Sequence, residues 1–320
     1  MLGRENVAYI VSDEHKGKRL ENIEIISFDE LKEIHFAFRV VIADVSQGAL
    51  YAQRLSSLKI PYAPLYGGME FFSLWQNIYR LSLWGMNLGL GSDYASSGEE
   101  AVLTLMTQKF NLPKRPILFD VGANHGNYTL LLSKHFPKAD IHLFEPGKTT
   151  FEICKKNVTK HLSSVKNIRF NNFGMSDKAG ESTLYYDNPG SGLASVYKRE
   201  LDYLNIDYSK SESITLKTID EYCAENNIDN IDFLKMDVEG NELNVLKGAK
   251  NMLEGGNISN IQIEFGGCNL DSRTIFRDFW NLLSTKYAVY YILQDGLSEI
   301  PNYQEALEIY MTSNFFFHKK

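Results

Sequence analysis

Short apolar runs alternate with amphipathic stretches over the C-terminal two thirds of the chain. The runs predict seven strands, at 117–121, 141–145, 168–174, 231–237, 261–265, 288–293 and 314–318. Stretches with helical spacing separate most of them, and strands joined by helices are typical of a doubly wound, mainly parallel α/β sheet. The last two strands lack a good helix between them, so we expect the sheet to end with an antiparallel strand.

The N-terminal part shows a weaker version of the same alternation. Apolar runs and one helical stretch between residues 6 and 66 predict a small α/β unit, which has no glycine-rich turn after its first strand. An aromatic-rich helical stretch follows. We therefore predict a small degenerate Rossmann-like α/β domain over residues 1–66, a helical connector over 67–96 and a large α/β domain over 97–320.

One segment interrupts the alternation in the large domain. Residues 181–219 contain two strand-like stretches around the loop "NPGSGLASVYKRE" (188–200), which predicts a hairpin-like insertion. Glycines and serines allow such a loop to move over a site, so the loop is a candidate lid or acceptor loop. The alternative is an ordinary solvated hairpin tip.

Composition narrows the class of protein. The chain has 320 residues and a net charge of −7 without a basic cluster, so we expect no nucleic-acid partner. Cys154, Cys223 and Cys268 are far apart, which argues against a disulfide framework or a zinc site. The N-terminus lacks a signal-peptide core, and no stretch approaches the roughly 18–20 apolar residues of a membrane span. We therefore expect a cytoplasmic protein.

The turn after the first strand of the large domain carries the strongest chemical signal. In "FDVGANHG", Asp120 ends a strand and Gly122 and Gly126 follow it, where positive φ angles and close backbone approach are allowed. Free N–H groups of the helix that begins near Asn127 favour an anion here. Asn124 and Asn127 stand where a dinucleotide fingerprint has its second and third glycines. The turn therefore suits a small zwitterion rather than a pyrophosphate.

A second acid identifies the expected cofactor. Glu145 ends the next strand, 25 residues after Asp120, where a carboxylate accepts from two ribose hydroxyls. A glycine turn with a ribose acid, but without the pyrophosphate glycines, points to S-adenosyl-L-methionine and makes a nicotinamide oxidoreductase improbable. The structural alternatives are a tight connection for the turn and a solvated strand-end acid for Glu145.

Several motifs together resemble the FkbM-type S-adenosylmethionine-dependent methyltransferases. They are "FDVGANHGNYT", "LFEPGKTTFEICKKNV", "FGMSDKAGESTLYY", "FLKMDVEGNELNVLKGA" and "IQIEF", within roughly residues 97–318. The resemblance implies a class I methyltransferase (Rossmann-like) fold. It also implies O-methylation of a sugar, such as a polysaccharide or glycolipid precursor, or of a secondary metabolite.

The resemblance also implies roles for individual positions. It places the methionine end of the cofactor at Asp120, Gly122, Asn124 and Gly126, and the ribose at Glu145. It places the adenine near Met175, Ser176 and Asp177, and the transferred methyl group near Asp237 and Glu239. His125 falls at a variable position of the motif and receives no cofactor role.

Methyl transfer to a sugar hydroxyl also requires removal of a proton from a weak acid, so a base or a metal is expected. Asp237 and Glu239 are two positions apart at a strand end and so face one cleft; we expect Asp237 to be the base and Glu239 to orient the substrate. In one alternative Asp237 only contacts the cofactor and Glu239 caps the next helix. In another, Asp237, Glu239 and Glu264 bind Mg²⁺.

The expected partners are a small-molecule or glycan acceptor and, through residues 1–66, a second copy of the chain. That segment resembles a truncated sugar-biosynthesis Rossmann module, which implies packing, partner docking or dimerisation rather than nucleotide binding. The alternative function is a catalytically inactive scaffold protein, with the same cofactor fold, in a glycan biosynthesis assembly.

Overall fold

The structure is a computed structural model that divides the chain into two compact units, residues 1–82 and residues 83–320. It describes residues 9–11, 19–20, 23–27, 29–31, 40–42, 48–58, 60, 62–64, 72–89, 93–162 and 167–320. Helix α3 (Phe72–Gly85) spans the division between the units. Part of the predicted connector 67–96 lies outside the described residues, and our three-part division of the chain stays a prediction.

The unit of residues 1–82 contains two small sheets. Strand β1 (Tyr9–Val11) pairs in parallel with β3 (Ile23–Ile26), and β2 (Arg19–Leu20) pairs antiparallel with β3. Strand β4 (Val40–Ile42) pairs in parallel with β5 (Tyr62–Pro64), and helix α2 (Gly48–Ser57) connects them. The described residues therefore form parallel strand pairs, as the alternation in the sequence predicts.

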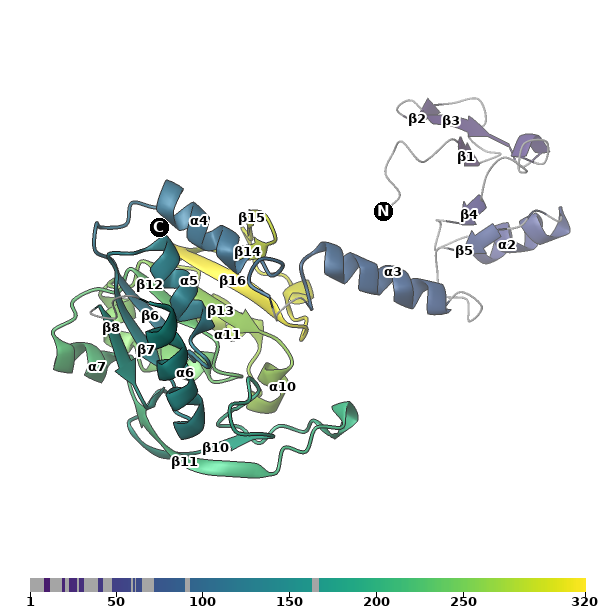
Figure 1. The fold of residues 1–320 in the computed structure, drawn as a ribbon. Helices are drawn as coiled ribbons and strands as arrows, with labels where there is room; N and C mark the ends of the chain where they lie inside the picture. The colour runs from purple at the N-terminus through teal and green to yellow at the C-terminus, as the bar shows by residue number, and fades with distance from the viewer. Residues whose placement is uncertain are drawn as a thin grey trace. The chain divides into compact units, whose positions relative to one another are not determined.

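The unit of residues 83–320 is built on an eight-stranded sheet (Figure 1). The strand order is β15-β14-β16-β13-β12-β6-β7-β8. The bounds are β6 Ile117–Val121, β7 Asp140–Phe144, β8 Ile168–Asn171, β12 Phe233–Met236, β13 Asn260–Phe265, β14 Tyr287–Leu293, β15 Gly296–Glu299 and β16 Ser313–Lys319. The pairs from β8 to β13 are parallel, while β16 runs antiparallel between β13 and β14. The predicted antiparallel last strand is confirmed.

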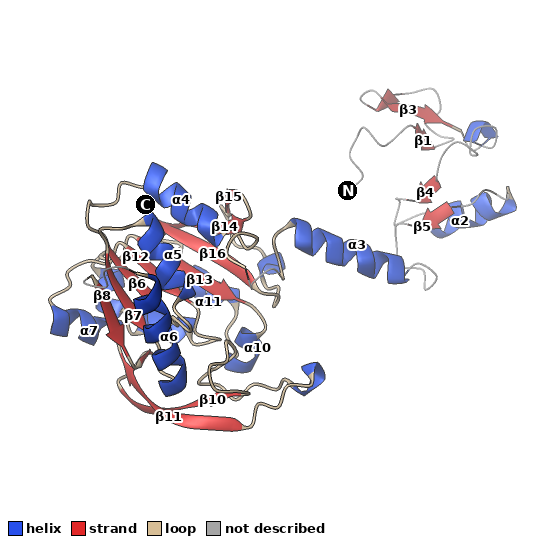
Figure 2. Ribbon diagram, in the orientation of Figure 1, coloured by secondary structure: helices blue, strands red, loops and turns tan. Residues whose placement is uncertain are grey.

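Helices cover both faces of this sheet (Figure 2). On one face lie α4 (Glu99–Lys109), α5 (Asn127–His135) and α6 (Lys148–His161), whose apolar residues pack on the strands. On the other face a larger core joins α7 (Ile219–Asn226), α8 (Glu242–Lys247), α9 (Lys250–Glu254) and α11 (Phe276–Leu283). Because successive strand residues point to opposite faces, every other residue of β6, β12 and β13 faces α4 and α5.

The remaining elements lie at the carboxyl end of the sheet or in short connections. Strand β9 (Gly174–Met175) pairs with β11 (Lys210–Lys217), and β11 pairs antiparallel with β10 (Gly180–Tyr186). The predicted insertion is therefore a hairpin. The short elements are η4 (Asp202–Leu204), α10 (Cys268–Ser272) and η5 (Glu305–Leu307). Among the described helices, none has the length and apolar character needed to cross a bilayer.

Candidate active site

A pocket opens where the central strands β6, β7 and β12 end. Its walls come from the turn after β6, the end of β7, strand β9, the turn after β12 and the loop 188–200. Of the ten predicted site residues, six line it: Gly122, Asn124, Glu145, Met175, Asp237 and Glu239. Asp120, Gly126 and Ser176 lie behind this lining, and Asp177 is exposed. The pocket is therefore where an open α/β sheet binds its ligands.

The two glycines of the turn adopt the predicted positive φ angles, 83° at Gly122 and 78° at Gly126. We expected glycines here so that a ligand could approach the backbone, but the structure gives a different reason for the absence of side chains at these two positions. A Cβ atom on Gly122 would lie 1.8 Å from the carbonyl oxygen of Asp237, and one on Gly126 would lie 2.6 Å from Val158 in α6. The glycines thus allow the turn to pack against the chain itself, and the residues of the turn that line the pocket are Gly122–His125 and Asn127.

Glu145 supports this turn. It is buried, and its two carboxylate oxygens accept the N–H groups of Asn124 at 3.0 Å and Gly147 at 2.9 Å. Burial raises the pKa of Glu145 to about 7, although these two hydrogen bonds lower it. Because a carboxylate has about four acceptor positions, roughly two remain available for hydroxyl groups in the pocket.

The three residues predicted to approach adenine have different environments. Met175 lines the pocket, whereas Ser176 is buried beside it. Asn241 donates to the carbonyl oxygen of Met175 at 3.0 Å, which joins this strand to the turn after β12. Asp177 points to solvent and accepts only a long hydrogen bond from Ser176, at 3.3 Å, among the described residues.

The acids of the other wall converge. One carboxylate oxygen from each of Asp237, Glu239 and Glu264 lies within 4.8 Å of the others. Strand alternation does not produce this, because β12 ends at Met236. Instead, Glu239 has a left-handed φ of 52° and Gly240 one of 103°. The turn folds back, and Glu242 accepts from the N–H groups of Val238 and Gly240.

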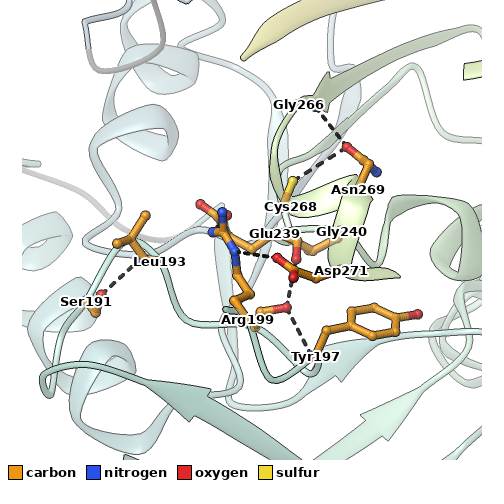
Figure 3. Close-up of polar contacts among 12 residues, drawn as sticks. Ser191, Leu193, Tyr197, Arg199, Glu239, Gly240, Gly266, Cys268, Asn269 and Asp271 are labelled. Carbon is orange, nitrogen blue, oxygen red and sulfur yellow. Dashed lines mark hydrogen bonds and ion pairs between the residues drawn. The ribbon is translucent and has the colours of Figure 1, made fainter. Parts of the chain in front are cut away.

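The alternative in which Glu239 caps the next helix is wrong. Helix α8 begins after Asn241, and no side chain caps it. The Glu239 carboxylate instead binds Arg199 at 2.6 Å, while Arg199 also donates to Asp271 at 3.3 Å (Figure 3). Burial and the charge of Asp237 raise the pKa of Glu239 to about 8, and Arg199 opposes that rise.

A buried lysine sits beneath Asp237. Lys235 is 4% exposed, and its ammonium nitrogen lies 3.2 Å from Asp237 and 3.9 Å from Asp120. Burial alone would lower the pKa of Lys235, but Asp237 and Asp120 raise it above its usual value. Lys235 therefore stays charged and neutralises acids on both sides of the pocket.

The loop 188–200 is tied to both ends of the pocket. At the glycine turn, Asn124 donates to the carbonyl oxygen of Ser191 at 3.2 Å, and His125 contacts that of Gly190 at 2.8 Å. At the acidic wall, the Ser195 hydroxyl donates to the Glu239 carbonyl oxygen at 2.7 Å. The loop is thus a pocket wall rather than a solvated tip, and His125, without a role in the sequence analysis, holds it.

The acidic trio does not fit a Mg²⁺ site in this arrangement. Mg²⁺ needs its oxygen ligands free and in near-octahedral geometry. Two of the three carboxylates already bind protein cations, Asp237 with Lys235 and Glu239 with Arg199. The positive charge beside these acids is therefore supplied by the side chains of Lys235 and Arg199.

Several residues of the site were not predicted from the sequence. Arg199 and Tyr94, just before α4, come from segments with no readable motif, whereas Asn241 lies within the motif "DVEGNEL" at a position to which no role was given. Lys235 did leave a signal. It is a charged residue inside the apolar strand "FLKM", whose four residues are all buried, and a lysine there must have an acidic partner.

This order of parallel strands, with the last strand inserted antiparallel and a pocket at the carboxyl ends, defines the class I methyltransferase fold. The Methyltransferase FkbM domain matches residues 120–290, more than half of the chain. The chain belongs to the FkbM methyltransferase family.

Several curated relatives share this domain. Methyltransferase sdnD of Sordaria araneosa is 31% identical over 164 residues, 43% of this chain and 62% of its own length. Hexuronic acid methyltransferase AglP of Haloferax volcanii is 29% identical over 171 residues, 53% of this chain and 64% of its own. 2-O-methyltransferase NoeI of Sinorhizobium fredii is 26% identical, with 43% and 59% covered. The chain thus spans about three fifths of the length of these relatives.

Among solved structures, a methyltransferase FkbM from Methylobacillus flagellatus is similar with a TM-score of 0.41 and 16% identity. The comparison covers 98% of this chain and 83% of that one.

Proposed function

We propose that this chain transfers the methyl group of S-adenosyl-L-methionine to a hydroxyl group of a sugar or a similarly hydroxylated metabolite. One observation carries the proposal. A single pocket joins the glycine turn (Gly122–His125 and Asn127), a buried carboxylate at Glu145 and the acidic wall at Asp237 and Glu239. Membership of the FkbM family supports the same chemistry.

The residues fit the cofactor on two counts. Glu145 has acceptor positions left over after its two backbone hydrogen bonds, which suits the two hydroxyls of a ribose. Helix α5 begins next to the pocket, and no side chain caps it, so its first N–H groups suit a carboxylate. Gly122 and Asn124 would then hold the methionine end, with Asp120 and Gly126 shaping the turn, and Met175 would approach the adenine.

When bound, the cofactor supplies an activated methyl group on a sulfonium. The chain has to orient the acceptor hydroxyl, exclude competing water and take up the hydroxyl proton. The loop 188–200 covers the pocket between the glycine turn and the acidic wall, which suits orientation and exclusion. The acidic wall suits the proton.

A sugar is the acceptor class that we propose. The relative AglP is named a hexuronic acid methyltransferase, and the relative NoeI is named a 2-O-methyltransferase, which supports a sugar acceptor and transfer to oxygen. A cytoplasmic enzyme acting on a glycan precursor is consistent with this choice. An inactive scaffold protein would keep the pocket but transfer nothing.

Calorimetry with S-adenosylhomocysteine tests the cofactor part. We expect binding by the native chain and, because a hydrogen bond to a charged group contributes about 1.5–3 kcal/mol, binding at least about tenfold weaker in Glu145→Gln. Glu181→Gln, an exposed acid in β10, is the matched control and should bind normally. Absence of binding by the native chain would overturn the proposal.

A transfer assay tests the reaction. The native chain is incubated with methyl-labelled S-adenosylmethionine and a panel of methyl glycosides of hexuronic acids and neutral hexoses, with and without EDTA. Label in an ether-linked product is expected under both conditions, because Lys235 and Arg199 supply the positive charge. Cofactor binding without transfer to any glycoside would favour the scaffold alternative.

A further inference from the structure

Glu264 is the one member of the acidic trio to which the sequence analysis gave only a metal-binding role. It lies near the carboxyl end of β13, two residues after Gln262, on the face of the sheet that also carries Lys235 and Asp120. Its carboxylate comes within 4.8 Å of those of Asp237 and Glu239. Glu264 therefore lies next to the acidic wall, one strand further from the glycine turn, although it is not among the residues that line the pocket.

The three acids differ in their partners. Asp237 is paired with Lys235 at 3.2 Å, and Glu239 is paired with Arg199 at 2.6 Å. Within the described part of the chain, no hydrogen bond or ion pair reaches the carboxylate of Glu264, and Asn314 lies opposite it on β16. A cation next to an acid stabilises its charged form and opposes a rise in its pKa, as Arg199 does for Glu239. Among the described residues, no cation is paired with Glu264.

The surroundings of Glu264 favour proton uptake. Burial, followed by the charges of Asp237, Glu239, Glu99 and Glu242, raises its pKa well above 4.5. The nearest cations, Arg199 and Lys235, are bound by the other two acids, and the Cys268 thiol nearby has a raised pKa as well. A general base works best when its pKa lies near the working pH, which an ordinary exposed glutamate does not achieve.

We propose that Glu264 is the catalytic base of this site, beside Asp237, which is paired with Lys235, and Glu239, which is paired with Arg199. The inference rests on the proposed methyl transfer. The acceptor O–H bond breaks and its proton goes to a Glu264 oxygen. The acceptor oxygen forms the new bond to the methyl carbon while the methyl–sulfur bond breaks and its electron pair stays on sulfur. Glu264 is partly exposed and then releases the proton to water.

An infrared titration tests the assignment without an acceptor. The stretching band of protonated carboxyl groups is recorded between pH 5 and 9 for the native chain and for Glu264→Gln, Asp237→Asn and Glu239→Gln. Glu99, Glu145 and Glu239 also titrate in this range, so the readout is the difference between the native and variant spectra. We expect a component of the band near neutral pH that is missing in Glu264→Gln and kept in Asp237→Asn. Loss of that band in Asp237→Asn, with its retention in Glu264→Gln, would return the base to Asp237.

Kinetics give the second readout. Because a positioned base contributes about 10²–10⁴-fold, Glu264→Gln should lower kcat by that factor and remove the rise of kcat with pH, while binding S-adenosylhomocysteine within about threefold of the native chain. Glu264→Asp keeps the carboxylate and should recover part of the rate if Glu264→Gln folds poorly. A native-like kcat in Glu264→Gln overturns the inference alone, whereas a native chain that binds no cofactor overturns the proposed function.

Discussion

At the scale of single residues, the site depends on two buried cations from different elements. Lys235 comes from the middle of β12 and lies between Asp120 and Asp237, with the Tyr128 ring 4.9 Å away. Arg199 comes from the end of the loop 188–200 and joins Glu239 to Asp271. Each cation fixes acids that would otherwise repel one another in a poorly solvated place.

Replacing Lys235 by methionine should leave buried acids without a counter-charge. Breaking a buried pair by removing one partner costs about 3–5 kcal/mol, so we expect the free energy of unfolding of Lys235→Met to fall by that amount. Urea denaturation measures it. Lys217→Met, which removes a more exposed pair with Glu225, is the control and should change stability by at most about 1 kcal/mol. Equal effects in both variants would contradict the role of Lys235.

The residues of the candidate site could be predicted only in part from the sequence. The turn "DVGANHG" and Glu145 stand out because they lie at the carboxyl ends of neighbouring parallel strands, where open α/β sheets bind their ligands. Arg199 could not be found this way, because it is 40 residues from Glu239 and 72 residues from Asp271 along the chain. Its partners are set by how the hairpin folds over the sheet, which no local pattern encodes.

At the scale of elements, α4 is joined to the sheet by polar contacts at its first residue. Glu99 is 4% exposed, and its oxygens accept from Gln262 in β13 at 2.7 Å and from the Ser97 hydroxyl at 2.9 Å. Burial raises the pKa of Glu99 to about 7, although the positive charge of Lys235 lowers it. This anchor places Tyr94, just before the helix, at the pocket.

The raised pKa makes stability depend on pH in a defined direction. The folded chain keeps a proton on Glu99 that the unfolded chain releases above about pH 4.5, so this stabilisation is complete below pH 4.5 and is lost as the pH rises through about 7. Glutamine does not titrate, and its amide oxygen can still accept from Gln262 while its amide nitrogen donates to the Ser97 hydroxyl. We expect the fall in unfolding free energy between pH 5 and 8 to be about 1–3 kcal/mol smaller in Glu99→Gln.

Urea denaturation at several pH values measures this difference. Glu152→Gln, which changes an exposed acid of α6, is the control and should leave the pH profile unchanged. A Glu99→Gln profile parallel to that of the native chain would show that Glu99 is ionised throughout.

The positions of the strands along the chain could be predicted from the sequence, whereas the contacts between elements could not. Each of the seven predicted strands of the large domain overlaps an observed strand, because short apolar runs separated by helical stretches are typical of the strands of a sheet covered on both faces. The conformation of the turn after β12 could not be predicted from the sequence. In it Glu239 has a positive φ as well as Gly240, and the contacts that hold Glu239 in that conformation come from Ser195 and Arg199.

At the scale of the unit formed by residues 83–320, the sheet is completed by its last strand. Strand β16 pairs with β13 over six residues and with β14 over five, so it lies inside the sheet rather than at an edge. Phe315 and Phe317 belong to the core on one face and Phe316 to the core on the other. Both cores therefore depend on this strand.

Truncating Phe316 tests that dependence. Removing a fully buried phenylalanine ring costs about 3–5 kcal/mol, so Phe316→Ala should lower the free energy of unfolding by that amount. The control is Leu270→Ala, which changes a side chain that is 59% exposed and should have an effect within about 0.5 kcal/mol. Chemical denaturation followed by tyrosine and tryptophan fluorescence gives both values. A loss below about 1 kcal/mol in Phe316→Ala would contradict this view of β16.

The position of β16 also bears on how the chain is made. Strands β13 and β14 are neighbours only through a partner whose residues, 313–319, are translated after both. While the ribosome is still adding those residues, β13 has one unpaired edge and the aromatic surfaces beside it stay open to water. A nascent chain paused before residue 313 is thus the form that chaperones would be expected to meet.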